Sequence, residues 1–151
     1  MTLNEFWDFA QAAERFYGDY RRQIMERYSL SAAETDVLMF LANNPGYDTA
    51  AQVSRVRRIP KSQVSLCVNA LCERGLLTGS HAPDNKKSVH LALTPCAEPV
   101  AAFGRTVQEE FSAALFSDFS EEEKAEFSRL HQKIAKNIES QRKDSKCKPS
   151  F

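Results

Sequence analysis

A run of side chains that can form hydrogen bonds opens the segment "IPKSQVSLCVNALCERGLLT", residues 59–78. Gln63 carries an amide that can bond adenine N6 and N7 with two parallel hydrogen bonds. Ser62 and Ser65 can bond bases or phosphates, and Lys61 is long enough to reach guanine or a phosphate. The same residues could instead only solvate and cap a helix. The charge and the elements around them decide between these two interpretations.

Charge is segregated along the chain, although the formal net charge of its 151 residues is zero. Residues 49–93 carry seven basic and two acidic residues, a surplus of five positive charges, so the remainder carries an equal negative surplus. A positive segment inside a negative frame is typical of a protein that meets a polyanion with one face. This favours nucleic acid as the partner of the polar segment.

Apolar residues at helical spacing predict the elements that hold this segment. Ser31 and Glu34 have the spacing of a capping box, Pro60 suits the first turn of a helix, and Gly75 can supply the left-handed residue at its end. Helices are therefore expected over residues 3–28, 31–43, 49–57 and from Pro60 to Gly75.

A hairpin is expected next. Residues 76–80 and 89–93 are short β-like runs, and the stretch "HAPDNKKS" between them is rich in turn residues and ends in two lysines. Three short helices, the last with a polar start, followed by a hairpin with a basic tip, predict a winged helix-turn-helix. The predicted fold class is thus mainly α with a small β-hairpin wing.

Two longer helices follow the hairpin. The first begins with Thr94 as cap and Pro95 in its first turn, and Pro99 is expected to bend it. The second begins at a capping box of Ser120 and Glu123. The residues expected to face inward from the second helix are Phe127, Leu130, Ile134 and Ile138. The polar tail after residue 140 is expected to be frayed.

The recognition helix of such a fold enters the major groove with its N-terminal side chains. The preceding arginines and the lysines at the wing tip are expected to contact the phosphate backbone. The predicted DNA-binding residues are Arg55, Arg57, Arg58, Lys61, Ser62, Gln63, Ser65, Asn69, Lys86 and Lys87.

Three stretches, "LSAAETDVLMFLANNPG", "TAAQVSRVRRIPKSQVSLCVNALCERGLLTGS" and "KKSVHLALTPCAEP", resemble the MarR family of bacterial transcriptional regulators. The resemblance covers roughly residues 30–138. It implies a homodimer that binds a pseudo-palindromic operator in double-stranded DNA, most often as a repressor. The family's wing usually holds an aspartate and an arginine where this chain has Asn85 and Lys87, so its wing contacts should be weaker and less selective.

The resemblance also implies a division of the chain. Residues 31–93 form the DNA-binding lobe, residues 1–30 and 94–140 form a helical dimerisation region, and residues 141–151 form a polar tail that we expect to be disordered. The long apolar stripes of the outer helices independently favour an association surface, because a monomer would leave them in water. Packing of these stripes within one chain is the alternative.

Aromatic residues gather in the first expected helix. They could line a pocket between the dimer helices and the DNA-binding lobe, where the family often binds small aromatic effectors. Binding there could change the spacing of the recognition helices and release DNA. The candidate residues are Phe9, Phe16, Tyr17 and Tyr20. The alternative is that these side chains form plain dimer core.

Two alternatives keep the same fold. Cys67 or Cys72 could make the regulator redox-responsive, because a thiol near a basic helix start would be more acidic than normal. The winged helix could also bind another protein without reading DNA. Polar and basic residues on the recognition helix count against that second alternative, since protein hot spots are rich in apolar anchors.

Other classes of function find no support in the sequence. His81, His90 and His131 are scattered and do not have the spacing of metal ligands. The sequence also contains no glycine-rich phosphate loop. We therefore expect no enzymatic activity, no metal site and no cofactor. No run approaches the roughly 20 apolar residues of a membrane span. The start "MTLNEFWDFAQ" is acidic where a signal peptide would be basic, which predicts a cytoplasmic protein without membrane contact.

Overall fold

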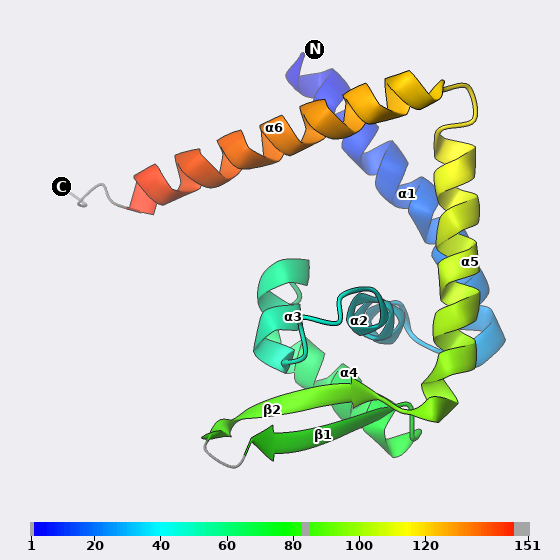
Figure 1. Cartoon of the computed structure of the whole chain (residues 1–151), viewed down its shortest axis with the longest axis vertical. Coiled ribbons are helices and arrows are strands. Elements are labelled where there is room, and N and C mark those ends of the chain that lie inside the picture. Colours follow the sequence, from blue (N-terminus) through cyan, green and yellow to red (C-terminus); the bar gives the residue numbers. More distant parts are fainter. Residues whose placement is uncertain (1, 83–84, 147–151) are drawn as a thin grey trace. The chain divides into compact units, whose positions relative to one another are not determined.

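The computed structural model describes residues 2–82 and 85–146, without the side chains of residues 81–88 and 143–146. It divides into two compact units, residues 1–111 and 112–151. The described elements are α1 (Leu3–Tyr28), α2 (Ala32–Asn43), α3 (Ala50–Arg57), α4 (Lys61–Glu73), β1 (Leu77–Ala82), β2 (Asn85–Leu93), the 3-10 turn η1 (Pro95–Ala97), α5 (Glu98–Leu115) and α6 (Glu121–Lys146) (Figure 1). Residues 112–115 of α5 and all of α6 belong to the second unit.

Capping boxes set where several helices begin. The Ser31 hydroxyl accepts from the amide of Glu34, whose carboxylate accepts from the Ser31 amide at 2.8 Å. Ser120 and Glu123 make the same pair of bonds ahead of α6. Both predicted capping boxes are confirmed. Each satisfies backbone donors that have no partner inside the helix.

Several boundaries differ from those predicted, and two of the differences have a clear local cause. Pro60 is the cap residue of α4 and has extended ψ, so the helix begins one residue later, at Lys61. Pro99 lies in the first turn of α5 because η1 comes before it, and there a missing N–H does not interrupt the helix. The last helix continues to Lys146, beyond the predicted end at Ser140; residues 147–151 of the predicted tail lie outside the described part.

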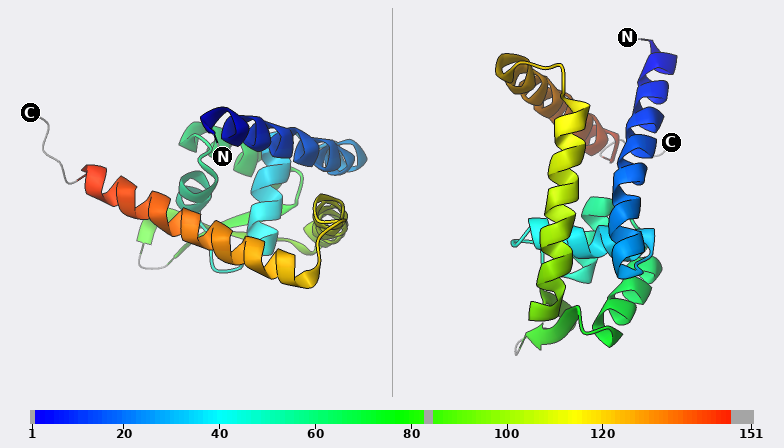
Figure 2. Two further views of the ribbon diagram at one scale, coloured as in Figure 1. Left: turned by 90° about the horizontal axis from the view of Figure 1, so that it is seen from above. Right: turned by 90° about the vertical axis from the view of Figure 1, so that its right-hand side faces the viewer.

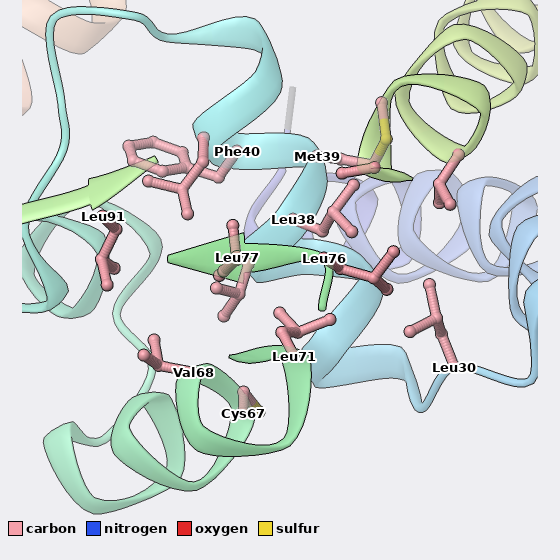
Figure 3. Packing of buried hydrophobic residues seen from close by; sticks show 14 of the residues in the cluster. Leu30, Leu38, Met39, Phe40, Cys67, Val68, Leu71, Leu76, Leu77 and Leu91 are labelled. Carbon is pink, nitrogen blue, oxygen red and sulfur yellow. The ribbon is translucent and has the colours of Figure 1, made fainter. Parts of the chain in front are cut away.

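The main hydrophobic core of the first unit lies where α2, α3, α4 and the hairpin meet. Leu38 of α2 and Leu71 of α4 are fully buried, and Leu77 of β1 is 2% exposed (Figure 3). Burying a leucine side chain contributes about 2 kcal/mol each. This shared core fixes α4 against the rest of the lobe and leaves its opposite face to solvent.

The hairpin is attached to the lobe at its base. β1 and β2 are antiparallel, with Leu77 opposite Leu93. The amide of Leu91 donates to the carbonyl of Asp48 at 2.6 Å, and Nδ1 of His90 lies 2.8 Å from the Asp48 carboxylate. The hairpin is confirmed, with longer strands than predicted. Its base is held to the chain just before α3.

Within the first unit, α5 packs beside α1 and against α2 (Figure 2). The Phe111 ring lies 5.2–5.6 Å from the rings of Phe16, Tyr17 and Tyr20 on α1. Gly104 of α5 faces Met39 of α2 so closely that a Cβ at this position would stand 2.3 Å from the Met39 sulfur. A side chain larger than hydrogen is therefore excluded unless Met39 moves.

The second unit contains an aromatic corner, formed by Phe116, Phe119, Phe127 and His131, whose ring centroids lie 5.3–6.5 Å apart in contacting pairs. The apolar residues expected to face inward from α6 are partly exposed in the single chain: Phe127 40%, Leu130 44%, Ile134 51% and Ile138 49%. No helix among residues 2–82 and 85–146 is long and apolar enough to cross a membrane.

Candidate nucleic-acid interface

The turn between α3 and α4 sets the direction of α4, the predicted recognition helix. Arg58 ends α3 in the left-handed conformation, with φ 55° and ψ 31°. The Ser54 hydroxyl donates to the carbonyl of Ile59 at 2.7 Å and closes the turn. These local constraints place the start of α4 at the surface.

The two faces of α4 differ in chemistry. Val64, Cys67, Val68 and Leu71 are buried and form its core face. Lys61, Ser62, Gln63, Ser65 and Asn69 are exposed. Among the described residues, none of these five side chains has a hydrogen-bond or ion-pair partner. Their donors and acceptors are therefore available to an external ligand, and their contacts with DNA stay a prediction.

The three arginines before α4 do not have equal freedom. Arg55 and Arg58 are exposed. Arg57 is also exposed, but its guanidinium lies 3.8 Å from Oδ1 of Asp36. Asp36 is bound more closely by Arg21 of α1, at 2.8 Å, and is only 16% exposed. The Asp36 carboxylate thus lies between Arg21 of α1 and Arg57, which is a predicted phosphate contact.

Arg74, which contributes to the positive surplus of residues 49–93, acts inside the fold. Its guanidinium donates to the carbonyls of Tyr28 and Ser29 and ties the end of α4 to the end of α1. Lys86 and Lys87 lie in β2, but their side chains are outside the described part of the chain. The wing lysines remain predicted phosphate contacts.

Leu66 is an apolar surface residue of α4 that is not among the predicted DNA-binding residues. It is 70% exposed on α4, between the exposed polar residues Ser62 and Asn69. The signal was present in the spacing, because positions 62, 66 and 69 share one face of a helix. Leu66 stands among apolar residues in the sequence, so its residue type alone does not show that it faces outward.

A cavity of about 380 Å³ opens beside the interface, entirely within the first unit. It is lined by Tyr17, Asp36, Met39, Phe40, Asn43, Asn44, Arg57, Gln108 and Phe111. Of the predicted effector residues, Tyr17 lines it, while Phe16 and Tyr20 pack on Phe111 at its margin. Phe9 is 56% exposed and is not part of the lining.

Three side chains that line this cavity are joined by hydrogen bonds, and a group of charged atoms lies at Asp36. The Asn43 amide donates to Gln108 at 2.7 Å, and Gln108 donates to the Tyr17 hydroxyl at 3.3 Å. Nε of Arg21 and Oδ1 of Asp36 are buried and have no hydrogen-bond partner among the described atoms. Two arginines around one carboxylate leave a local positive surplus at this end of the cavity.

The environment of Cys67 does not favour the redox-responsive alternative, which assumed an acidic thiol. Burial, and then the carboxylates of Glu34 and Asp36, raise the pKa of the Cys67 thiol above its usual value, whereas the sequence suggested a more acidic thiol. Cys72 is half-buried. Within residues 2–82 and 85–146, no three His, Cys, Asp or Glu side chains are grouped as metal ligands would be.

Comparison with known proteins connects this geometry to a family. A sequence model described as "MarR family" matches residues 28–88, from the end of α1 to the wing. No curated protein sequence matches the chain.

Solved structures share the fold over most of the chain. A MarR family regulator from Listeria monocytogenes in complex with a 26mer DNA aligns with a TM-score of 0.78 at 18% identity, covering 100% of this chain and 99% of that one. BpsR of Bordetella bronchiseptica, whose DNA binding is regulated by 6-hydroxynicotinic acid, aligns with a TM-score of 0.66 at 20% identity, covering 85% and 91%. A MarR/EmrR family regulator from Acinetobacter sp. ADP1 aligns with a TM-score of 0.75 at 15% identity, covering 93% and 99%.

The family match falls on the segment that contains α2, α3, α4 and the hairpin, and the remaining helices follow the same fold. Residues 28–88 are therefore similar in sequence to the MarR family, and solved structures at 15–20% identity share the fold of this chain.

Proposed function

We propose that this regulator binds a pseudo-palindromic DNA operator as a homodimer and represses transcription by occupying it. The observation that carries the proposal is the outer face of α4, where polar side chains are exposed and have no partner within the described chain. Such groups gain hydrogen bonds from base edges at little cost, because no internal bond must first be broken.

Exposed apolar faces support the dimer. The apolar residues of α6, from Phe127 to Ile138, recur at helical spacing and are 40–51% exposed in the single chain. Near the start of α1, Leu3, Trp7 and Phe9 are 54–71% exposed. A second copy of the chain would cover such surfaces. Two-fold symmetry would then place two recognition helices about 34 Å apart, one turn of DNA.

The cavity beside Arg57 supports control by a small aromatic effector. Its wall has the Tyr17 and Phe111 rings, amide groups and the arginine surplus around Asp36, which together suit a planar aromatic acid. BpsR offers a parallel, since its DNA binding is regulated by an aromatic acid. An anion that binds Arg57 would compete with Asp36 and with DNA for the same guanidinium.

Operator binding is tested with genomic DNA fragments. The purified protein is mixed with sheared genomic DNA, and bound fragments are recovered and sequenced. A repressor should enrich a few promoter fragments that share an inverted repeat. Recovery without preference for any sequence would contradict the proposal.

A salt series then separates DNA binding from a protein-docking role. The logarithm of affinity for the enriched fragment should fall steeply with the logarithm of salt concentration, with a slope of about −0.9 for each phosphate contacted. An affinity that hardly changes with salt would argue against a phosphate-contacting interface.

The effector proposal has its own test. A set of small aromatic acids is screened for release of the bound operator, with matched aromatic amides as uncharged controls. Release by acids and not by amides is expected, and Arg57→Gln should weaken the effect. If no aromatic compound changes operator binding at millimolar concentration, the cavity does not serve this role.

A further inference from the structure

Leu66 lies in the middle of the surface that faces DNA in the proposed function. Its side chain is 70% exposed, the second most exposed of the large apolar residues in the described part of the chain. A lone exposed leucine is common on protein surfaces and by itself indicates nothing. The position of Leu66 on α4 is what matters.

Helix geometry puts Leu66 at the centre of the outer face. With about 100° of rotation per residue, the buried residues Val64, Cys67, Val68 and Leu71 define one side of α4. Leu66 then points within about 30° of the opposite direction, together with Ser62 and Asn69. Gln63 lies further round, at the edge of this face. Any groove that receives α4 therefore meets Leu66 directly.

The chemistry of the neighbours identifies the kind of partner. The other exposed residues from Lys61 to Glu73 are polar: Lys61, Ser62, Gln63, Ser65, Asn69 and Glu73. A helix that docks on a protein would present several apolar anchors at helical spacing, whereas α4 presents one. A single apolar group among hydrogen-bonding groups matches the major groove, where the thymine C5-methyl is the one apolar feature of a base edge.

We infer that Leu66 is a specificity-determining residue that contacts the C5-methyl group of a thymine in each operator half-site. The inference rests on the proposed function, since it requires that α4 enters the major groove. This contact would add an apolar interaction to a surface whose other exposed side chains can form hydrogen bonds. Covering one methyl group is worth about fourfold in affinity.

Deoxyuridine substitution tests the contact, because it removes the methyl group and keeps the base pair. Each thymine of the operator recovered from genomic DNA is replaced in turn, symmetrically in both half-sites. The wild-type protein should lose at least about fourfold in affinity at one position in each half-site and be nearly indifferent at the others.

Leu66→Ala supplies the second arm. The variant should bind the thymine operator more weakly and should no longer distinguish thymine from deoxyuridine at the sensitive position. Because Leu66 is exposed, the Leu66→Ala variant should have the same midpoint of thermal unfolding as the wild-type protein. Val56→Ala is the matched control, since Val56 is a 46% exposed residue on α3, and it should keep the full thymine preference.

The outcomes separate this inference from the proposed function. If no genomic fragment is preferred, the proposed function itself fails. If an operator is bound but no thymine is sensitive, or if Leu66→Ala keeps the thymine preference, the Leu66 contact is wrong while operator binding stands.

Discussion

In the proposed function, Gln63 of α4 would distinguish between base pairs, whereas Lys86 and Lys87 of β2 would bind the phosphate backbone. Gln63 offers a bidentate amide, and its side chain has no partner among the described residues. Hydrogen bonds of this kind discriminate between bases because the wrong base leaves buried donors unpaired. Lys86 and Lys87, by contrast, are predicted to meet phosphates, which carry no sequence information.

Gln63→Ala should therefore cost roughly 1–3 kcal/mol of binding free energy and relax preference at one base position. The measurement is competition binding with operators substituted at each position. Lys86→Ala is the comparison, because it should weaken binding to all sequences alike and flatten the salt slope by about one. If the Gln63→Ala protein keeps the base preferences of the wild type, Gln63 does not contact a base edge.

Thiol reactivity should follow burial and local charge. The raised pKa of Cys67 means that less of its thiol is deprotonated at pH 8, and burial restricts access. Cys96 is exposed. Alkylation followed by mass spectrometry should therefore modify Cys96 well before Cys67, and denaturant should bring the two rates together.

This order bears on the redox alternative. If mild peroxide releases the operator, if a thiol reductant reverses that release and if Cys67→Ser abolishes it, the redox alternative is restored despite the raised pKa. Indifference of operator binding to peroxide agrees with the environment of Cys67.

At the scale of elements, the contact between α2 and α5 depends on a missing side chain. A Cβ at Gly104 would come within 2.3 Å of the Met39 sulfur, and Met39 is 2% exposed. Overpacking of a buried contact costs about 1–3 kcal/mol, while alanine in place of glycine favours a helix by up to about 1 kcal/mol. The steric cost should lie at the low end of its range because the Met39 thioether is flexible, so it should about cancel the gain in helix propensity.

Gly104→Ala should thus change the free energy of unfolding by less than about 1 kcal/mol and should not raise it, measured by denaturant titration at one fixed protein concentration. Gly18→Ala is the matched control in α1, where an added Cβ meets nothing within 4 Å, and it should raise stability. Equal shifts in both variants would show that the Met39 contact does not limit the packing.

The elements predicted from sequence are those fixed by local chemistry. Capping boxes at Ser31 and Ser120 and the left-handed Gly75, with φ 68°, depend on neighbours a few residues apart. Contacts between distant segments were not predictable. The ion pairs of Asp36 with Arg21 and Arg57 join three helices, and nothing in the local pattern couples those positions.

The candidate site was predictable in outline for the same reason. The polar start of α4 is a local pattern, and the structure exposes each of its predicted residues. Leu66 was missed because its neighbours in sequence, Val64, Cys67 and Val68, are core residues, and only the helical rotation separates it from them. Arg74 was counted as a free charge because its bonds to α1 depend on tertiary packing.

At the scale of the whole molecule, the proposed dimer should depend on the apolar face of α6. Ile134→Glu places a charge at the centre of that face, where burial in an interface would be costly. The variant should shift toward a monomer in analytical ultracentrifugation and lose most of its operator affinity. Lys136→Glu is the control, because it adds negative charge on the far side of the same helix. A dimeric Ile134→Glu protein would place the interface elsewhere.

Arg58, between α3 and α4, has a left-handed backbone, and this conformation has opposite consequences for folding stability and for the proposed affinity for DNA. A non-glycine residue at φ 55° costs about 1 kcal/mol relative to glycine, so a glycine there would strengthen the folded state. In the proposed function, the same exchange would also remove a predicted phosphate contact. Glycine at position 58 should therefore raise the free energy of unfolding and lower the affinity for DNA. Heat-adapted variants should carry glycine here only where another cation nearby restores that affinity.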